Sequence, residues 1–193
     1  MKIDLTVNAD EGIRRLISDK TAGDTIPPYA LFGHLGTHFD VMDKTFSLDN
    51  TERRGFLFDV RNVTDKEIGE GDIDIGKIDE NDFVIFYSGC LKEHGYGTSE
   101  YIKTGIELSN SLIKLLIDKR ISMIGVDFPG IRKQSEHVQA DQYCADNDVF
   151  VIENLANLDV LCESAHGKEF LVHTYPLNFS GLTGLPCRVV AEI

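Results

Sequence analysis

Short apolar runs separated by polar segments dominate the second half of the chain. Three of them, residues 82–88 (DFVIFYS), 121–126 (ISMIGV) and 149–152, are rich in β-branched and aromatic residues and predict strands. Amphipathic segments lie between these runs. Strands that alternate with helices in this way form parallel pairs joined by crossovers, so the centre of the chain is expected to be α/β.

Helix signals fill the gaps between the runs. Thr98 and Ser99 are capping residues, and Glu100 adds a carboxylate to the first turn. The positions that recur at helical spacing after them are Ile102, Ile106, Ser109, Ile113 and Leu116. One helix is therefore expected to continue to Lys119–Arg120, and a shorter one over 140–146.

The ends of the chain contain more strand signals. Residues 55–60, 169–174 and 188–193 read as strands, whereas 43–54 is polar and reads as a surface loop. We expect one α/β domain over 1–193, with a mixed central sheet, βαβ units and flanking helices.

Composition narrows the classes of partner. With 193 residues and 42% hydrophobic content, the chain can bury a core of its own. Its net charge of −13 and lack of a basic run argue against nucleic acid. We expect a cytoplasmic protein, because the N-terminus shows no signal-peptide pattern and no apolar run is long enough for a membrane helix. The four cysteines form no CxxC pair and are expected to be reduced.

The sharpest chemical feature is the segment 33–40, GHLGTHFD. His34, His38 and Asp40 are donors that zinc, manganese and iron accept in proteins. If the segment is extended, these side chains share one face, with Gly36 leaving room for an ion; a tight turn would serve equally well. Two histidines satisfied by core hydrogen bonds are the structural alternative.

A second group of candidates lies downstream. Glu153 ends the predicted strand 149–152, where open α/β sheets place ligands, and it should lie at the same end as His34. Alternatively, Glu153 caps a helix over 155–161. His137 and Asp141 are four residues apart and would share one helix face, which is also typical of a solvated surface. No GxSxG, Walker A or GxGxxG motif is present.

Residues 34–40 (HLGTHFD) resemble the HxGTHxDxPxH signature of the cyclase family of metal-dependent hydrolases, which includes bacterial kynurenine formamidase and isatin hydrolase. Four later segments resemble that family in the same order: FVIFYSG at 83–89, GVDFP at 125–129, FVIENLANL at 150–158 and LNFSGLTGLPCRVV at 177–190. The resemblance implies a cyclase-like swivelling β/β/α fold and a homodimer or larger homo-oligomer.

The resemblance also implies a ligand set. His34, His38 and Asp40 would hold a metal, with Glu153 as a further ligand. The family has a histidine about a dozen residues before that glutamate. Counting without a gap puts Asp141 there, and a four-residue gap puts His137 there.

The chain departs from the signature at two positions. Met42 replaces the proline and Lys44 replaces the final histidine, which the resemblance would assign to proton transfer. A lysine with an ordinary pKa of about 10.4 is a cation at neutral pH and could stabilise an oxyanion; burial would be needed to make it a base. The acidic neighbours Asp43 and Asp49 favour the cation. If Lys44 points away, His94 or His137 is the next candidate to move the proton.

The resulting prediction is a metal-dependent hydrolase of an amide, formamide or small cyclic amide, with zinc (alternatively manganese) and one or two ions per chain. Tyr87, Ser88 and His94 are candidates for contacts to a small-molecule substrate. The alternative is a catalytically silent member of the same family that only binds a metal or ligand.

Overall fold

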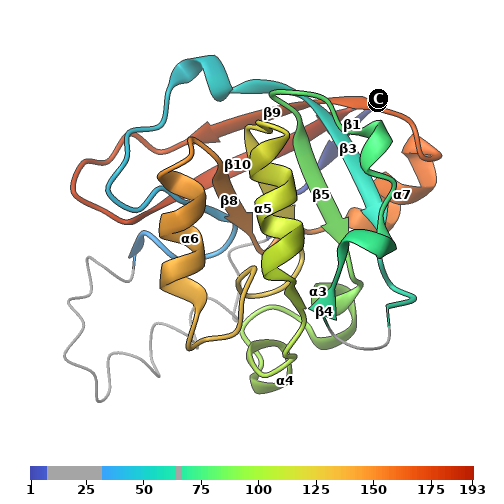
Figure 1. Cartoon of the computed structure of the whole chain (residues 1–193), viewed down its shortest axis with the longest axis horizontal. Helices are drawn as coiled ribbons and strands as arrows, with labels where there is room; N and C mark the ends of the chain where they lie inside the picture. Colours follow the sequence, from blue (N-terminus) through green and yellow to red (C-terminus); the bar gives the residue numbers. More distant parts are fainter. Residues whose placement is uncertain (8–31, 64–66) are drawn as a thin grey trace.

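The computed structural model describes residues 1–7, 32–63 and 67–193. Within these residues eight strands form one mixed sheet in the order β1-β10-β2-β8-β7-β5-β3-β9. Their bounds are β1 Lys2–Asp4, β2 His38–Asp40, β3 Glu52–Asp59, β5 Phe83–Tyr87, β7 Met123–Val126, β8 Phe150–Glu153, β9 Phe170–Pro176 and β10 Gly184–Glu192. Because β9 also pairs with β10, the sheet closes into a barrel (Figure 1).

The parallel centre of the sheet agrees with the prediction. β3, β5, β7 and β8 are parallel neighbours, so the three apolar runs do lie side by side. The antiparallel strands β2, β9 and β10 complete the barrel. A separate two-stranded sheet joins β4 (Glu67–Ile68) to β6 (Glu107–Leu108).

The helices lie outside the barrel. Their bounds are α3 Cys90–His94, α4 Ser99–Ile102, α5 Asn110–Asp118, α6 His137–Ala145 and α7 Leu158–Ala165, with short 3₁₀ turns at Leu48–Asn50, Glu70–Asp72 and Ile75–Lys77. Figure 1 shows α5 and α6 over one face of the sheet, with α3 and α4 at the end of the barrel to which β5 runs. The helix predicted at 140–146 is therefore confirmed as α6, which begins three residues earlier.

The single helix expected over 98–120 is wrong. Thr98 does cap a helix, accepting from Tyr101 N–H, but α4 ends at Ile102. Gly105 then takes a left-handed conformation with φ of 69°, β6 follows, and Ser109 caps α5. The helical spacing was misleading because Ile102 is exposed and α4 buries Tyr101 instead, whereas Ile113 and Leu116 of α5 are buried.

Two smaller expectations also need correction. The loop predicted at 43–54 ends early, because β3 begins at Glu52. The helix predicted at 155–161 begins only at Leu158, since Leu155 pairs with Thr6 and Asn157 takes a left-handed conformation. Glu153 is thus no helix cap.

Two apolar layers hold the fold together. All eight barrel strands contribute to an inner cluster that includes Phe39, Phe83, Ile152 and Val189. The alternate residues of β5, β7 and β8 point outward and pack against α5 and α6 in a second cluster. No helix in the described residues is long and apolar enough to cross a membrane.

Candidate metal centre

Strand β2 presents two of the predicted ligands on one face. His38 and Asp40 alternate with Phe39, which is buried in the inner barrel cluster. His38 lies directly opposite Glu153 on the antiparallel strand β8. This register places His38 of the 34–40 motif beside Glu153, which lies more than a hundred positions later in the sequence. It agrees with the prediction that Glu153 lies at the same end of the sheet as the motif.

His34 reaches the same place from a turn. Gly36 has a φ of 69°, so residues 34–37 do not continue the strand, and the tight-turn alternative is the one observed. His34 Nδ1 lies 3.0 Å from Asp40 Oδ1, and its Nε2 lies 2.9 Å from Thr183 Oγ1.

Helix α6 adds both alternatives for the downstream ligand. His137 Nε2 is 3.0 Å from Asp141 Oδ2 and 3.2 Å from Glu153 Oε1. The helix places the two residues one turn apart on the face that meets β8, so they are not a solvated surface pair. His137 and Asp141 therefore both lie in the cluster, so the two alignments considered for the downstream ligand each point to a residue of the site.

The cluster contains more buried oxygen atoms than the protein satisfies. Asp40, Asp141 and Glu153 are each buried. Within the described residues, Asp40 Oδ2, Asp141 Oδ1 and Glu153 Oε1 have no hydrogen-bond partner, although Glu153 Oε1 is within ion-pair distance of His137. Burying unpaired carboxylate oxygens is costly unless a cation compensates them.

The donor atoms form two overlapping groups, each with ligand atoms within 4.8 Å of one another. One contains His34, His38 and Asp40; the other contains Asp40, His137, Asp141 and Glu153. Imidazole and carboxylate donors at this spacing fit a divalent transition-metal ion, and Asp40 is common to both groups.

The electrostatics reflect the crowded carboxylates. Burial alone would lower the pKa of His38, but the charges of Asp40 and Glu153 raise it to about 9. The hydrogen bond to Asp141 and the ion-pair contact with Glu153 raise the pKa of His137 to about 11. Burial raises the pKa of Asp141 to about 7, with the charges of Asp40 and Glu153 adding to the effect. The carboxylates of the cluster thus favour positive charge nearby. Without a metal ion, protons on His38 and His137 supply that charge.

A pocket of about 750 Å³ opens onto this cluster. His34, His38, His137 and Glu153 line the side that faces the cluster. Its other walls come from two tyrosines, three apolar residues and five cationic or amide side chains, among them Tyr96, Tyr101, Ile102, Ile106, Pro129, Lys103, Arg132, Lys133, Gln134 and Asn154. A pocket of this size accommodates a small organic molecule.

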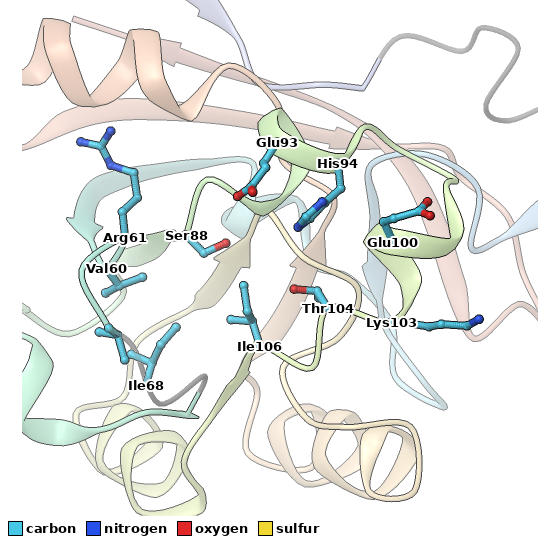
Figure 2. Close-up of a pocket in the computed structure, with 11 residues that line it drawn as sticks. Val60, Arg61, Ile68, Ser88, Glu93, His94, Glu100, Lys103, Thr104 and Ile106 are labelled. Atoms are coloured by element: carbon cyan, nitrogen blue, oxygen red, sulfur yellow. The ribbon is translucent and has the colours of Figure 1, made fainter.

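The expected substrate contacts lie elsewhere. Ser88 and His94 line a second pocket of about 430 Å³ (Figure 2), which shares only Lys103, Thr104 and Ile106 with the pocket beside the cluster. Ser88 Oγ donates to Asp127 Oδ1 at 2.6 Å, and the Tyr87 ring lies beneath Arg61. The structure therefore does not bring these three residues to the pocket beside the cluster.

Tyr96 and Tyr101 line the pocket beside the cluster, but the sequence pattern did not predict either of them as a site residue. Tyr96 lies two residues after His94, a predicted substrate contact, so the prediction came close to this segment but chose another side chain. Nothing in the local pattern singles out Tyr101.

Lys44 is paired at the surface. Its Nζ lies 2.7 Å from Asp146 Oδ1 and 3.2 Å from Asp43 Oδ1. Hydrogen bonds to these carboxylates raise its pKa, so Lys44 is a cation rather than a base. It does not line the pocket beside the cluster.

The relatives of the chain agree with this architecture. The profile of the family described as putative cyclase matches residues 3–133. The chain belongs to the putative cyclase family. The match covers the 34–40 motif and ends before His137, Asp141 and Glu153. None of the curated proteins matches this cyclase-family sequence.

Solved structures share the fold of this cyclase-family protein. A potential metal-dependent hydrolase with cyclase activity has a TM-score of 0.74 at 23% identity, covering 99% of this chain and 96% of that one. A predicted metal-dependent hydrolase from Bacillus stearothermophilus has a TM-score of 0.69 at 21% identity, covering 99% of this chain and 97% of that one. Isatin hydrolase A from Labrenzia aggregata has a TM-score of 0.73 at 18% identity, covering 100% of this chain and 93% of that one.

Proposed function

We propose that this protein is a metal-dependent hydrolase of an amide, a formamide or a small cyclic amide. The observation that carries the proposal is the group of buried carboxylate oxygens without hydrogen-bond partners beside a small-molecule pocket. Membership of the putative cyclase family and the hydrolase descriptions of the structural relatives support the same chemistry.

The metal would be held by His34, His38, Asp40, Asp141 and Glu153. Their mixed nitrogen and oxygen donors suit zinc, with manganese as the alternative, and the shared Asp40 allows one or two ions per chain. When bound, a divalent ion of this kind polarises a carbonyl and lowers the pKa of water.

His137 is the group that we assign to proton transfer. Its side chain is 30% exposed, lines the pocket, and has its Nε2 held by two carboxylates. The carboxylates that raise the pKa of His137 to about 11 are the proposed metal ligands, so a cation bound to them would offset their charge and lower that pKa. The imidazole could then take a proton from the attacking water and deliver it to the leaving nitrogen. The Tyr96 ring, which is half-buried and lines the same pocket, would contact an aromatic part of the substrate.

Elemental analysis and a hydrolysis panel test the proposal. The purified protein should contain zinc or manganese and cleave at least one of N-formyl arylamines, isatin or cyclic imides. His38→Ala should lose the metal and reduce turnover by at least about a hundredfold, since it removes a central ligand. His173→Ala is the matched control, because His173 pairs with Glu52 and Glu192 away from the cluster. Full metal content in His38→Ala would show that the ligand set is wrong.

A silent metal-binding protein is the second candidate. Lys44 favours it, because the position of the family's final histidine holds a surface-paired cation. Bound metal with no turnover on the whole panel would select this alternative. In either case we propose a small-molecule ligand, a cytoplasmic location and a homodimer or larger assembly, the last of which light scattering would test.

A further inference from the structure

Two tyrosine hydroxyls on the pocket wall bond to residues that lie beside the proposed metal ligands in the sequence. The Tyr101 hydroxyl donates to Asn154 Oδ1 at 2.5 Å, and Tyr101 itself is 1% exposed. Tyr96 Oη accepts a hydrogen bond of 2.8 Å from Gly36 N–H. Both contacts end on neighbours of proposed metal ligands, because Asn154 follows Glu153 and Gly36 lies two residues before His38.

The orientation of the Asn154 carboxamide follows from its partners. Its nitrogen donates to the Gly36 carbonyl at 2.9 Å, while its oxygen accepts from Tyr101. The opposite orientation would set the amide oxygen against that carbonyl oxygen, which is an unfavourable contact between two acceptors in a buried site. The Asn154 backbone carbonyl also accepts from Thr37 Oγ1 at 2.8 Å, so Asn154 is held at both ends.

The Gly36 carbonyl then orients the imidazole. His38 Nδ1 lies 2.9 Å from this oxygen and therefore carries the proton that it donates. His38 Nε2 is left facing Asp40 and Glu153, at 3.6 and 3.7 Å from their carboxylate oxygens. A histidine ligand is typically held in this way, with one ring nitrogen donating to a carbonyl and the other free for the metal.

We propose that Tyr101 and Asn154 are positioning residues that hold the Gly36 carbonyl, and through it the His38 ring, in the orientation that offers Nε2 to a metal ion. The proposal rests on the proposed function only in requiring that the cluster bind a metal. The Tyr101 hydroxyl would then affect metal binding through Asn154, although it contacts neither the proposed metal ligands nor the Gly36 carbonyl.

The test compares Tyr101→Phe and Asn154→Gly with the wild type. The first keeps the ring and removes only the hydroxyl, and the second tolerates the left-handed backbone of Asn154, which has a φ of 61°. Zn²⁺ affinity is measured by competition with a chromophoric chelator. Solvent exchange of the His38 Nδ1 proton is measured by NMR on the zinc-loaded protein.

Each variant should bind Zn²⁺ about tenfold more weakly and exchange the His38 Nδ1 proton faster. Thermal unfolding of the metal-free proteins controls for a general loss of structure, and Tyr143→Phe, at an exposed tyrosine of α6, should match the wild type. Unchanged Zn²⁺ affinity and exchange in Tyr101→Phe would overturn the positioning role, even if Asn154→Gly fails to fold. A wild-type protein that binds neither Zn²⁺ nor Mn²⁺ would overturn the proposed function as well.

Discussion

Asp40, Asp141 and Glu153 place three carboxyl groups in one buried space between β2, β8 and α6. In the described residues one oxygen atom of each carboxyl group has no hydrogen-bond partner, and the neighbouring imidazoles of His38 and His137 supply compensating positive charge. At the scale of single residues, this arrangement trades stability of the metal-free protein for affinity toward a cation.

Asp141→Asn tests this trade. Removing one buried charge from the crowded cluster should raise the free energy of unfolding of the metal-free protein at pH 8 by about 1–3 kcal/mol. The same change should weaken Zn²⁺ binding at least about tenfold, because a ligand or its close neighbour is lost. Denaturant unfolding with and without a chelator measures both effects. A variant that is less stable without metal would contradict the assignment.

Asp127 predicts a dependence of stability on pH outside the metal cluster. Burial raises its pKa to about 6, even though it accepts hydrogen bonds from Ser88 and Gly89. The folded state therefore holds this proton more tightly than the unfolded state. The contribution to stability is full below the unfolded pKa of about 4 and is lost as pH rises to about 6.

The difference in unfolding free energy between wild type and Asp127→Asn isolates this contribution. It should fall by up to roughly 3 kcal/mol between pH 4 and pH 6. The variant itself should be less stable at neutral pH, since an amide cannot accept all the hydrogen bonds that the carboxylate accepts. A difference that stays constant across this range would show that Asp127 ionises normally.

The elements place the cluster through register and helix phase. β2 and β8 align His38 with Glu153, and α6 sets His137 and Asp141 one turn apart above β8. The most informative departure from expectation is the break between α4 and α5, because it releases residues 103–106 to line the pocket.

Ser109 defines the start of α5 after this break. Its Oγ accepts from Leu112 N–H at 3.1 Å, satisfying a helix-end donor. Ser109→Ala should lower the free energy of unfolding by about 1 kcal/mol, while Ser109→Asp should restore it. Denaturant titration measures both variants. If Ser109→Ala has no effect, the apolar contacts of Leu112 and Ile113 alone position the helix.

At the scale of the whole molecule, the candidate site links the barrel to its outer layer. Strand β2 and strand β8 belong to the closed sheet, and α6 packs on its outside. An ion that joins ligands from all three elements should stabilise the folded state as a unit, because the unfolded chain holds no such site.

Chelation is therefore expected to lower the midpoint of thermal unfolding. At a free metal concentration one hundred times the Kd, binding adds about 2.7 kcal/mol, or several degrees in a protein of this size. Differential scanning calorimetry with and without EDTA measures the shift. His38→Ala should show little or none of it, and an equal shift in that variant would point to a different site.

Local pattern determined much of this protein. The three apolar runs predicted β5, β7 and β8 and their parallel order. A short run of β-branched and aromatic residues between polar ends is typical of a buried strand. The motif at 34–40 identified the donors, and the α/β ligand rule placed Glu153 near them.

Tertiary structure alone decided the rest. The turn at Gly36, the closure of β9 onto β10 and the end of α4 at Ile102 depend on contacts between distant segments, which local propensity does not encode. The same reason explains why Tyr101 was not anticipated and why Lys44 was expected near the site. Asn154 and Asp146, their respective partners, are 53 and 102 residues away and meet them only when the barrel closes and α6 packs against it.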